Sequence, residues 1–176
     1  SVLEVGSAIV DAQTEFLIDI SASNQFPVAG FQFTLTDNPD ILESVSVSNT
    51  ERTEGFTIQA QEQANGSVII IGFNLLGGTI DVGTGSIMQL AYISESVIET
   101  QEVSLEVSEF YFGDSEGLEL PAFSSSGLVT VNPQGASTLS IESLLCEPAC
   151  AQVGDSGILN ISLENEIEVA GFQFNL

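Results

Sequence analysis

The stretch Val28–Leu35, with the sequence VAGFQFTL, decides the fold, and it occurs a second time in the chain. Val169–Leu176 reads VAGFQFNL, so seven of the eight positions are identical at a distance of 141 residues. Phe31, Phe33 and Leu35 alternate with polar residues, which is the pattern of a β-strand with one buried face.

The similarity continues on the N-terminal side of both copies. Leu17–Ser21 (LIDIS) corresponds to Ile158–Ser162 (ILNIS). Leu3–Val5 corresponds to Leu139–Ile141 once extra residues around Cys146–Cys150 are allowed. An ordered match of this length predicts a tandem array with a period of about 140 residues, and a repeat that long is a whole domain.

We therefore expect residues 1–131 to form one complete unit, residues 132–137 a linker, and residues 138–176 the first strands of a second, incomplete unit. Unpaired apolar strands need a partner, so we expect the second unit to be completed by continuation of the chain or by another subunit through strand addition. The residues expected in the assembly strands are Val28, Gly30, Phe31, Phe33, Leu35, Val169, Gly171, Phe172, Phe174 and Leu176.

Hydrophobic alternation separated by turn residues predicts about nine strands, and hence an all-β fold, an antiparallel β-sandwich. Asn65-Gly66, between Phe56–Gln61 and Val68–Phe73, is the strongest hairpin signal and predicts a type I′ turn. A short helical turn over Pro39–Val45, capped by Asn38, is the one helical segment expected. Eight phenylalanines are expected in the core rather than on a sugar-stacking platform, which favours Trp and Tyr: Phe26, Phe31, Phe33, Phe56, Phe73, Phe110, Phe112 and Phe123.

The charge balance excludes several classes of function. The chain has 25 acidic residues, one basic residue (Arg52) and no His, for a net charge of −24. This balance excludes nucleic acid as a partner, because phosphate contacts need Lys and Arg. It also excludes Ser-His-Asp catalysis and Lys nucleophiles, so we expect no enzymatic activity. No stretch is apolar enough for membrane insertion.

Residues 2–131 resemble a cohesin domain, the sandwich module of cellulosome scaffolding proteins and of many secreted bacterial and archaeal repeat proteins. An opening strand over Leu3–Val10 is followed by a strand over Thr14–Ser21 and by Val28–Leu35, which is similar to the family's "gFqf.l" strand. Asp37–Glu43 is similar to the "yDP..Le" turn, and Gly83–Leu90 resembles the later glycine-rich strand. The resemblance implies a cohesin-like, jelly-roll-like sandwich that binds a dockerin module through one sheet face.

Two further clusters are candidate sites. Turns rich in oxygen donors favour calcium as a cofactor, although capping of the turns by the same side chains explains them equally well; the residues are Asp37, Asp40, Asp81, Asp114 and Glu116. Cys146 and Cys150 are spaced for a small disulfide loop, and two free thiols or half of a metal site are the alternatives.

The favoured function is a non-enzymatic building block of an extracellular fibre, surface layer or adhesive stalk. Such a block assembles head-to-tail with copies of itself or neighbouring repeats, and the protein is expected to be secreted or on the cell surface. The alternative is a recognition module that binds a dockerin-like partner or a polysaccharide.

Overall fold

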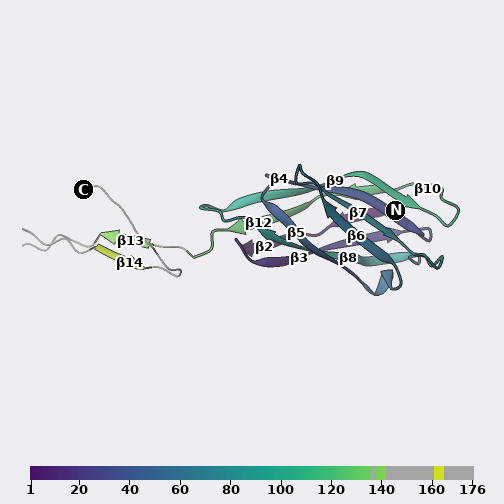
Figure 1. The fold of residues 1–176 in the computed structure, drawn as a ribbon, viewed down its shortest axis with the longest axis horizontal. Coiled ribbons are helices and arrows are strands. Elements are labelled where there is room, and N and C mark those ends of the chain that lie inside the picture. The colour runs from purple at the N-terminus through teal and green to yellow at the C-terminus, as the bar shows by residue number, and fades with distance from the viewer. Residues whose placement is uncertain (136–137, 142–160, 165–176) are drawn as a thin grey trace, which may run out of the picture. The chain divides into compact units, whose positions relative to one another are not determined.

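A computed structural model describes residues 1–135, 138–141 and 161–164 (Figure 1). The chain divides into two compact units, residues 1–134 and residues 135–176. The first unit is a sandwich of two β-sheets with a single turn of 3-10 helix, η1 (Glu51–Thr53), among the described residues. The predicted all-β sandwich is therefore confirmed.

The strands of the first unit form two sheets, here named sheet A and sheet B. Sheet A has the order β11 (Phe123–Ser125), β1 (Val2–Val5), β3 (Glu15–Asn24), β8 (Gly83–Ser94) and β5 (Leu42–Asn49). Sheet B has the order β2 (Ala8–Asp11), β12 (Gly127–Asn132), β9 (Gln101–Gly113), β4 (Gly30–Asn38), β7 (Val68–Phe73) and β6 (Thr57–Glu62), with β10 (Glu119–Leu120) also paired to β9. The pairs β1–β11 and β2–β12 are parallel, and all other described pairs are antiparallel.

The expected opening strand Leu3–Val10 is two strands, one in each sheet. The chain leaves β1 at Gly6, whose N–H donates to the Asp19 carbonyl at 2.8 Å, and then pairs with β12 as β2. A Cβ at Gly6 would lie 2.8 Å from that same carbonyl oxygen, so only glycine fits this crossing. This split, together with the short β10 and β11, gives more strands than the nine expected.

The Asn65-Gly66 hairpin is confirmed, but its turn is not type I′. β6 and β7 are antiparallel neighbours, and the loop closes through Gln63 N–H to Ser67 O at 2.8 Å and Gly66 N–H to Gln63 O at 3.0 Å. Only Gly66 in this loop has a positive φ, of 79°. The geometry is that of a longer hairpin loop, in which a turn is followed by one left-handed glycine.

The helical turn expected over Pro39–Val45 is wrong. β5 already begins at Leu42, and no helix occurs among residues 39–45. The Asp37 carboxylate accepts the backbone N–H groups of Ile41 and Leu42, each at 2.9 Å. The side chain of Asp37 thus satisfies these two backbone N–H groups, so the segment does not need a helical turn capped by Asn38.

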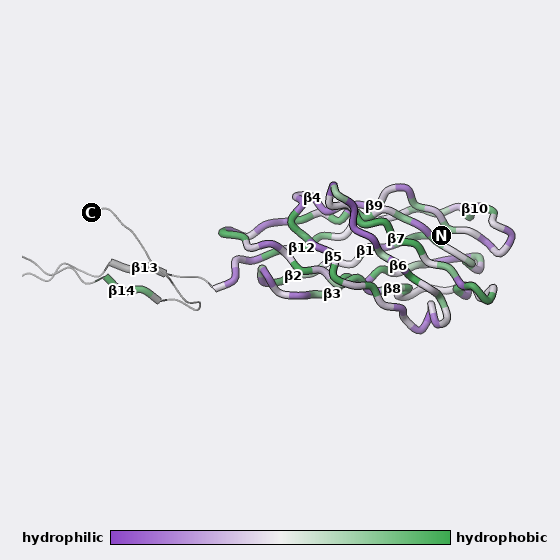
Figure 2. The backbone as a smooth tube through the Cα atoms, viewed as in Figure 1, coloured by the Kyte–Doolittle hydropathy of each residue, from purple (hydrophilic) through white to green (hydrophobic). Residues whose placement is uncertain are grey.

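The core lies between the sheets and is built from alternate residues of the strands. Phe31, Phe33 and Leu35 of β4 are at most 2 % exposed, and Figure 2 shows hydrophobic residues recurring along the strands. Phe56 and Phe112 are buried as expected, and Phe73 and Phe110 are partly buried. The expectation is wrong for three rings, since Phe26 is 53 % exposed, Phe123 is 76 % exposed, and Phe73 lies on the outer side of β7 with Ile71.

Arg52, the chain's one basic residue, ties two strands of sheet A to a loop. Its Nη1 donates to the carbonyls of Ala22 and Gly85 at 2.8 and 3.1 Å. Its Nη2 donates to Asn24 Oδ1 at 2.6 Å and to the Asp81 carbonyl at 2.7 Å. Partial burial lowers the pKa of the guanidinium, although the charge of Asp81 opposes this. An arginine always remains charged at physiological pH, so all four bonds are charge-assisted.

We predict that Gly72→Ala destabilises the first unit by more than about 2 kcal/mol, because overpacking a core displaces its neighbours. A Cβ at Gly72 would lie 2.2 Å from Cζ of Phe31. Urea unfolding measures the loss, and Phe31→Leu in the same chain should recover part of it. Gly77→Ala gives the cost of backbone strain without a clash, since Gly77 has a φ of 78° but no atom lies within 4 Å of its Cβ position. A Gly72→Ala midpoint equal to that of the unmodified chain would contradict the packing argument.

We also predict that Arg52→Lys lowers the free energy of unfolding by about 1–3 kcal/mol, since an ammonium cannot reproduce a forked set of bonds to four acceptors. Both residues are cationic, so the net charge of −24 is unchanged. Denaturant unfolding gives the value. An unchanged midpoint would show that charge, and not the geometry of the guanidinium, matters here.

Candidate functional site

The outer face of sheet B carries three rows of side chains across β6, β7, β4 and β9. The strand register places these residues side by side, and they point away from the core because their neighbours along each strand point into it. The rows are Thr57, Phe73, Gly30 and Gly113; then Gln59, Ile71, Gln32 and Tyr111; then Gln61, Ile69, Thr34 and Ser108. We call these three rows the uncharged patch.

No member of the uncharged patch is acidic or basic, in a chain of net charge −24. Gln32, Gln59 and Gln61 are exposed, Ile71 is 39 % exposed, and Ile69, Phe73 and Tyr111 are partly buried. Figure 2 shows that β7, which crosses the patch, is strongly hydrophobic. Apolar and amide side chains without charge are the composition of the centre of a protein–protein interface.

Local hydrogen bonds hold the β9 side of the patch. A register shift in β9 between Ser108 and Tyr111 places Glu109 at a φ of 49°, and Thr34 Oγ1 donates to Glu109 Oε2 at 3.0 Å. The Tyr111 hydroxyl donates to the Gly117 carbonyl at 3.0 Å. A Cβ at Gly113 would lie 2.8 Å from Tyr111 Cε1, so this glycine leaves room for the ring.

Glu106, opposite Thr36, and Glu109 form an acidic border along this side.

The outer face of sheet A differs in chemistry. Asp19 lies at its centre, where Oδ2 accepts the Ser21 hydroxyl at 3.0 Å and Oδ1 accepts the Ser86 hydroxyl at 2.6 Å. Thr84 donates to Ser23 Oγ at 3.0 Å. The polar groups of this face are therefore largely paired with one another, and its centre carries a charge.

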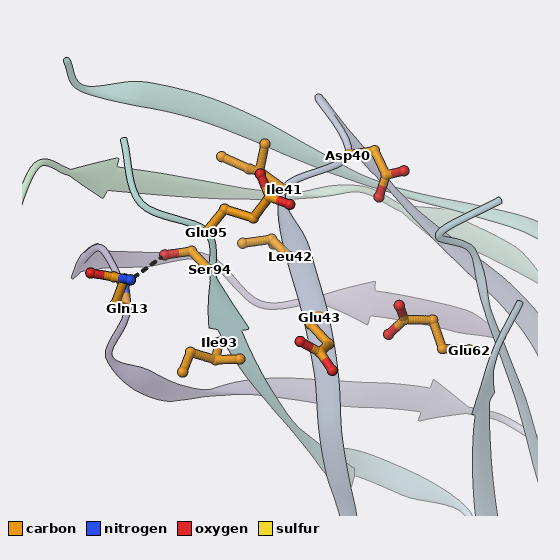
Figure 3. Close-up of a pocket in the computed structure, with 9 residues that line it drawn as sticks. All are labelled: Gln13, Asp40, Ile41, Leu42, Glu43, Glu62, Ile93, Ser94 and Glu95. Carbon is orange, nitrogen blue, oxygen red and sulfur yellow. Dashed lines mark hydrogen bonds between the residues drawn. The ribbon is translucent and has the colours of Figure 1, made fainter. Parts of the chain in front are cut away.

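An open depression of about 350 Å³ lies where β5 begins, beside the end of β8 (Figure 3). Four carboxylates line it: Asp40, Glu43, Glu62 and Glu95. Glu62 Oε2 already accepts the Ser44 N–H at 2.7 Å. Among the described residues, no three Asp, Glu, Cys or His side chains come together closely enough to hold a metal ion.

The expected calcium ligands lie in separate turns. Asp37 lies in β4 just before its last residue, Asn38, and Asp40 lies in the turn that follows. Asp114 and Glu116 follow Gly113, which pairs with Gly30 at the other end of β4. Asp37 caps Ile41 and Leu42, and Asp114 Oδ1 accepts the N–H groups of Glu116 and Leu118 at 2.9 and 2.8 Å. The Asp81 carbonyl accepts from Arg52 and Asn24. Asp37 and Asp114 thus cap turns with their carboxylates, whereas Asp81 accepts hydrogen bonds through its backbone carbonyl. Calcium binding stays a prediction.

The expected assembly strand Val28–Leu35 is central in sheet B. β4 pairs with β7 on one side and with β9 on the other, so both of its edges are occupied. The assembly residues Val169, Gly171, Phe172, Phe174 and Leu176, and the expected disulfide of Cys146 with Cys150, lie outside the described residues. Assembly through these strands stays a prediction.

Comparison with known proteins gives the fold its closest description. No protein-family model and no curated protein matches the chain. Among solved structures, CaCohA2 of Clostridium acetobutylicum in complex with CaDoc0917 matches with a TM-score of 0.66 at 16 % identity, over 74 % of this chain and 99 % of that chain. The first unit has a cohesin fold.

Two further cohesins match over a similar range. One is a type I cohesin–dockerin complex of Clostridium thermocellum, with a TM-score of 0.64 at 13 % identity, over 75 % of this chain and 93 % of that chain. The other is a non-cellulosomal cohesin of the archaeon Archaeoglobus fulgidus, with a TM-score of 0.62 at 18 % identity, over 75 % of this chain and 91 % of that chain. The expected cohesin resemblance is confirmed for the fold. In the described part of the chain, no helix is long and apolar enough to span a membrane.

We predict that Asp37→Asn changes how stability depends on pH. Burial raises the pKa of the Asp37 carboxyl, against the lowering effect of its backbone hydrogen bonds. A carboxyl whose pKa is higher in the folded than in the unfolded state stabilises the fold fully at pH values below its ordinary pKa. This stabilisation is lost as the pH rises through the raised pKa. Asparagine keeps an oxygen for Ile41 and Leu42 but carries no charge, so this loss should disappear.

Urea unfolding between acidic and neutral pH measures the effect. As the pH rises, the free energy of unfolding of Asp37→Asn should increase relative to that of the unmodified chain. Glu15→Gln, which removes an equal charge from an exposed residue of β3 that does not contribute to the pKa shift of Asp37, corrects for net charge. Parallel pH profiles for the unmodified chain and Asp37→Asn would contradict the assignment.

Proposed function

We propose that the first unit is a recognition module that binds a dockerin-type partner through the uncharged patch. The single observation that carries the proposal is the absence of charge from three cross-strand rows of a face in so acidic a chain. Burying an unpaired carboxylate in an interface is costly, so a surface that binds a partner must keep its centre free of charge.

The patch offers contacts of two kinds. Ile69, Ile71 and Phe73 follow one another on the outer side of β7 and provide apolar area. Gln32, Gln59 and Gln61 flank them on β4 and β6 with amides that both donate and accept hydrogen bonds. The apolar side chains of β7 thus lie between the polar side chains of β4 and β6, as the apolar core of a specific interface lies within its polar rim.

The backbone beneath the patch is rigid. β4 and β7 each pair with neighbours on both sides, and their inward residues pack in the core. A preformed surface loses little conformational entropy on binding, which supports tight association without a large change in shape.

The acidic border defines the chemistry of the partner. Glu106 and Glu109 lie beside the patch, and the whole chain is strongly negative. A partner that carries Lys or Arg at the rim of its own apolar surface would be attracted, whereas an acidic one would be repelled. Four of the matching solved structures are described as cohesin–dockerin complexes or as a cohesin in complex with a dockerin, which supports a dockerin-type module as this partner.

The building-block function stays a prediction, as do secretion and a cell-surface location. The recognition function is favoured because β4, the expected assembly strand of the first unit, is already paired with β7 and β9, whereas the uncharged patch faces outward. Carbohydrate is a weaker candidate partner, since Tyr111 is the one partly exposed Tyr in the described first unit and there is no Trp.

We predict that Ile71→Glu lowers the affinity for a dockerin module at least about tenfold, because it places a charge at the centre of the interface. Calorimetry with a panel of dockerin modules, including those of the solved complexes, measures the affinity. Leu17→Glu is the matched control, since Leu17 is 56 % exposed on the outer side of β3 in sheet A.

Urea unfolding of both variants confirms that the sandwich remains folded. Equal affinities of Ile71→Glu and the unmodified chain would exclude the uncharged patch as the binding face. Binding by no member of the panel would contradict the choice of a dockerin-type partner.

A further inference from the structure

A second pair of strands in the chain repeats the strand pairing of the first unit. β13 (Thr138–Ile141) and β14 (Ile161–Glu164) form an antiparallel two-stranded sheet. In this sheet Leu139 pairs with Leu163, Ser140 with Ser162, and Ile141 with Ile161.

The equivalent strands of the first unit are β1 and β3. There Leu3 pairs with Ala22, Glu4 with Ser21, and Val5 with Ile20. The sequence match equates Leu139–Ile141 with Leu3–Val5, and Ile161-Ser162 with Ile20-Ser21. Each described pair of β13 and β14 is therefore the counterpart of a pair of β1 and β3.

This agreement is more than the sequence repeat implies. The repeat says which residues correspond, but it does not say which strands pair or in what register. A slip of one residue would turn every side chain to the opposite face. The connection from Ile141 to Ile161 is five residues longer than that from Val5 to Ile20, so the same register is reached across loops of different length.

We infer that residues 138–164 carry the opening strand pair of a second sandwich with the same fold as the first unit. In the first unit β3 is the central strand of sheet A, with β1 on one side and β8 on the other, and it pairs with β8 along ten registered positions. The second sandwich therefore requires a strand of the β8 type beside β14. Binding of a partner by this second sandwich would rest on the proposed function, whereas its fold does not.

Extension of the full chain tests the inference. Residues 36–132 are appended after Leu176, which corresponds to Leu35, so that the second copy gains the remaining strands of the first. The extended chain is first shown to be a monomer by size-exclusion chromatography. The backbone amides of the appended segment should then exchange about 100-fold more slowly, or slower still, than those of an unstructured peptide, as in a stable unit.

Two variants of the extended chain give the matched comparison. Ile161 corresponds to Ile20, which is 0 % exposed, so Ile161→Asp should abolish protection of the second unit and leave the first unchanged. Ser140 corresponds to the exposed Glu4, so Ser140→Glu should leave both units protected. Appended residues that exchange as unstructured peptide, or equal protection in Ile161→Asp, would overturn the inference.

Binding stoichiometry separates this inference from the proposed function. Two protected units that bind two dockerin modules per chain would support both. Two protected units that bind none would leave the tandem fold established and contradict the recognition function.

Discussion

A chain with 25 acidic residues and one basic residue cannot hold itself together with ion pairs. Its stability must come from apolar burial and backbone hydrogen bonds, which have to exceed the mutual repulsion of the carboxylates. Arg52 illustrates the constraint, because it bonds three backbone carbonyls and an amide oxygen instead of a carboxylate oxygen. A guanidinium used in this way joins the end of β3, the beginning of β8 and the preceding loop, and thereby closes one end of sheet A.

The same constraint separates the faces of the sandwich. Carboxylates lie in turns, at strand ends and on the outer face of sheet A, where Asp19 is paired with two serine hydroxyls. In sheet B they lie on β9, where Glu106 and Glu109 border the uncharged patch. The strands β4, β6 and β7 instead place Gln, Thr and apolar residues outward over three successive rows. In β4 one strand serves two purposes, since Phe31 and Phe33 fill the core while Gln32 and Thr34 form part of the outer patch. Gln32 is exposed and available for a contact, whereas Thr34 is buried and donates to the Glu109 carboxylate.

How well the sequence predicts each part of the structure depends on how far apart in the sequence the interacting residues lie. Local patterns were sufficient for the strands around Phe31–Leu35 and Val68–Phe73, and for the hairpin at Asn65-Gly66. They failed where a distant group decides the conformation. The chain crosses between sheets at Gly6 because of the Asp19 carbonyl, and Asp37 replaces the expected helical turn with a capped one.

The uncharged patch was missed for the same reason. Residues 30–36, 57–61 and 68–73 each lack charge, and this signal is present in the sequence. The patch nevertheless depends on β4 lying between β7 and β9, a neighbourhood that no local pattern reveals. Cohesins with 13–18 % identity share the fold, but a shared fold at this identity does not fix the residues on the outer faces. The proposed recognition must therefore be tested on this chain's own outer-face residues, of which Gln32 and Ile71 lie directly opposite each other at the centre.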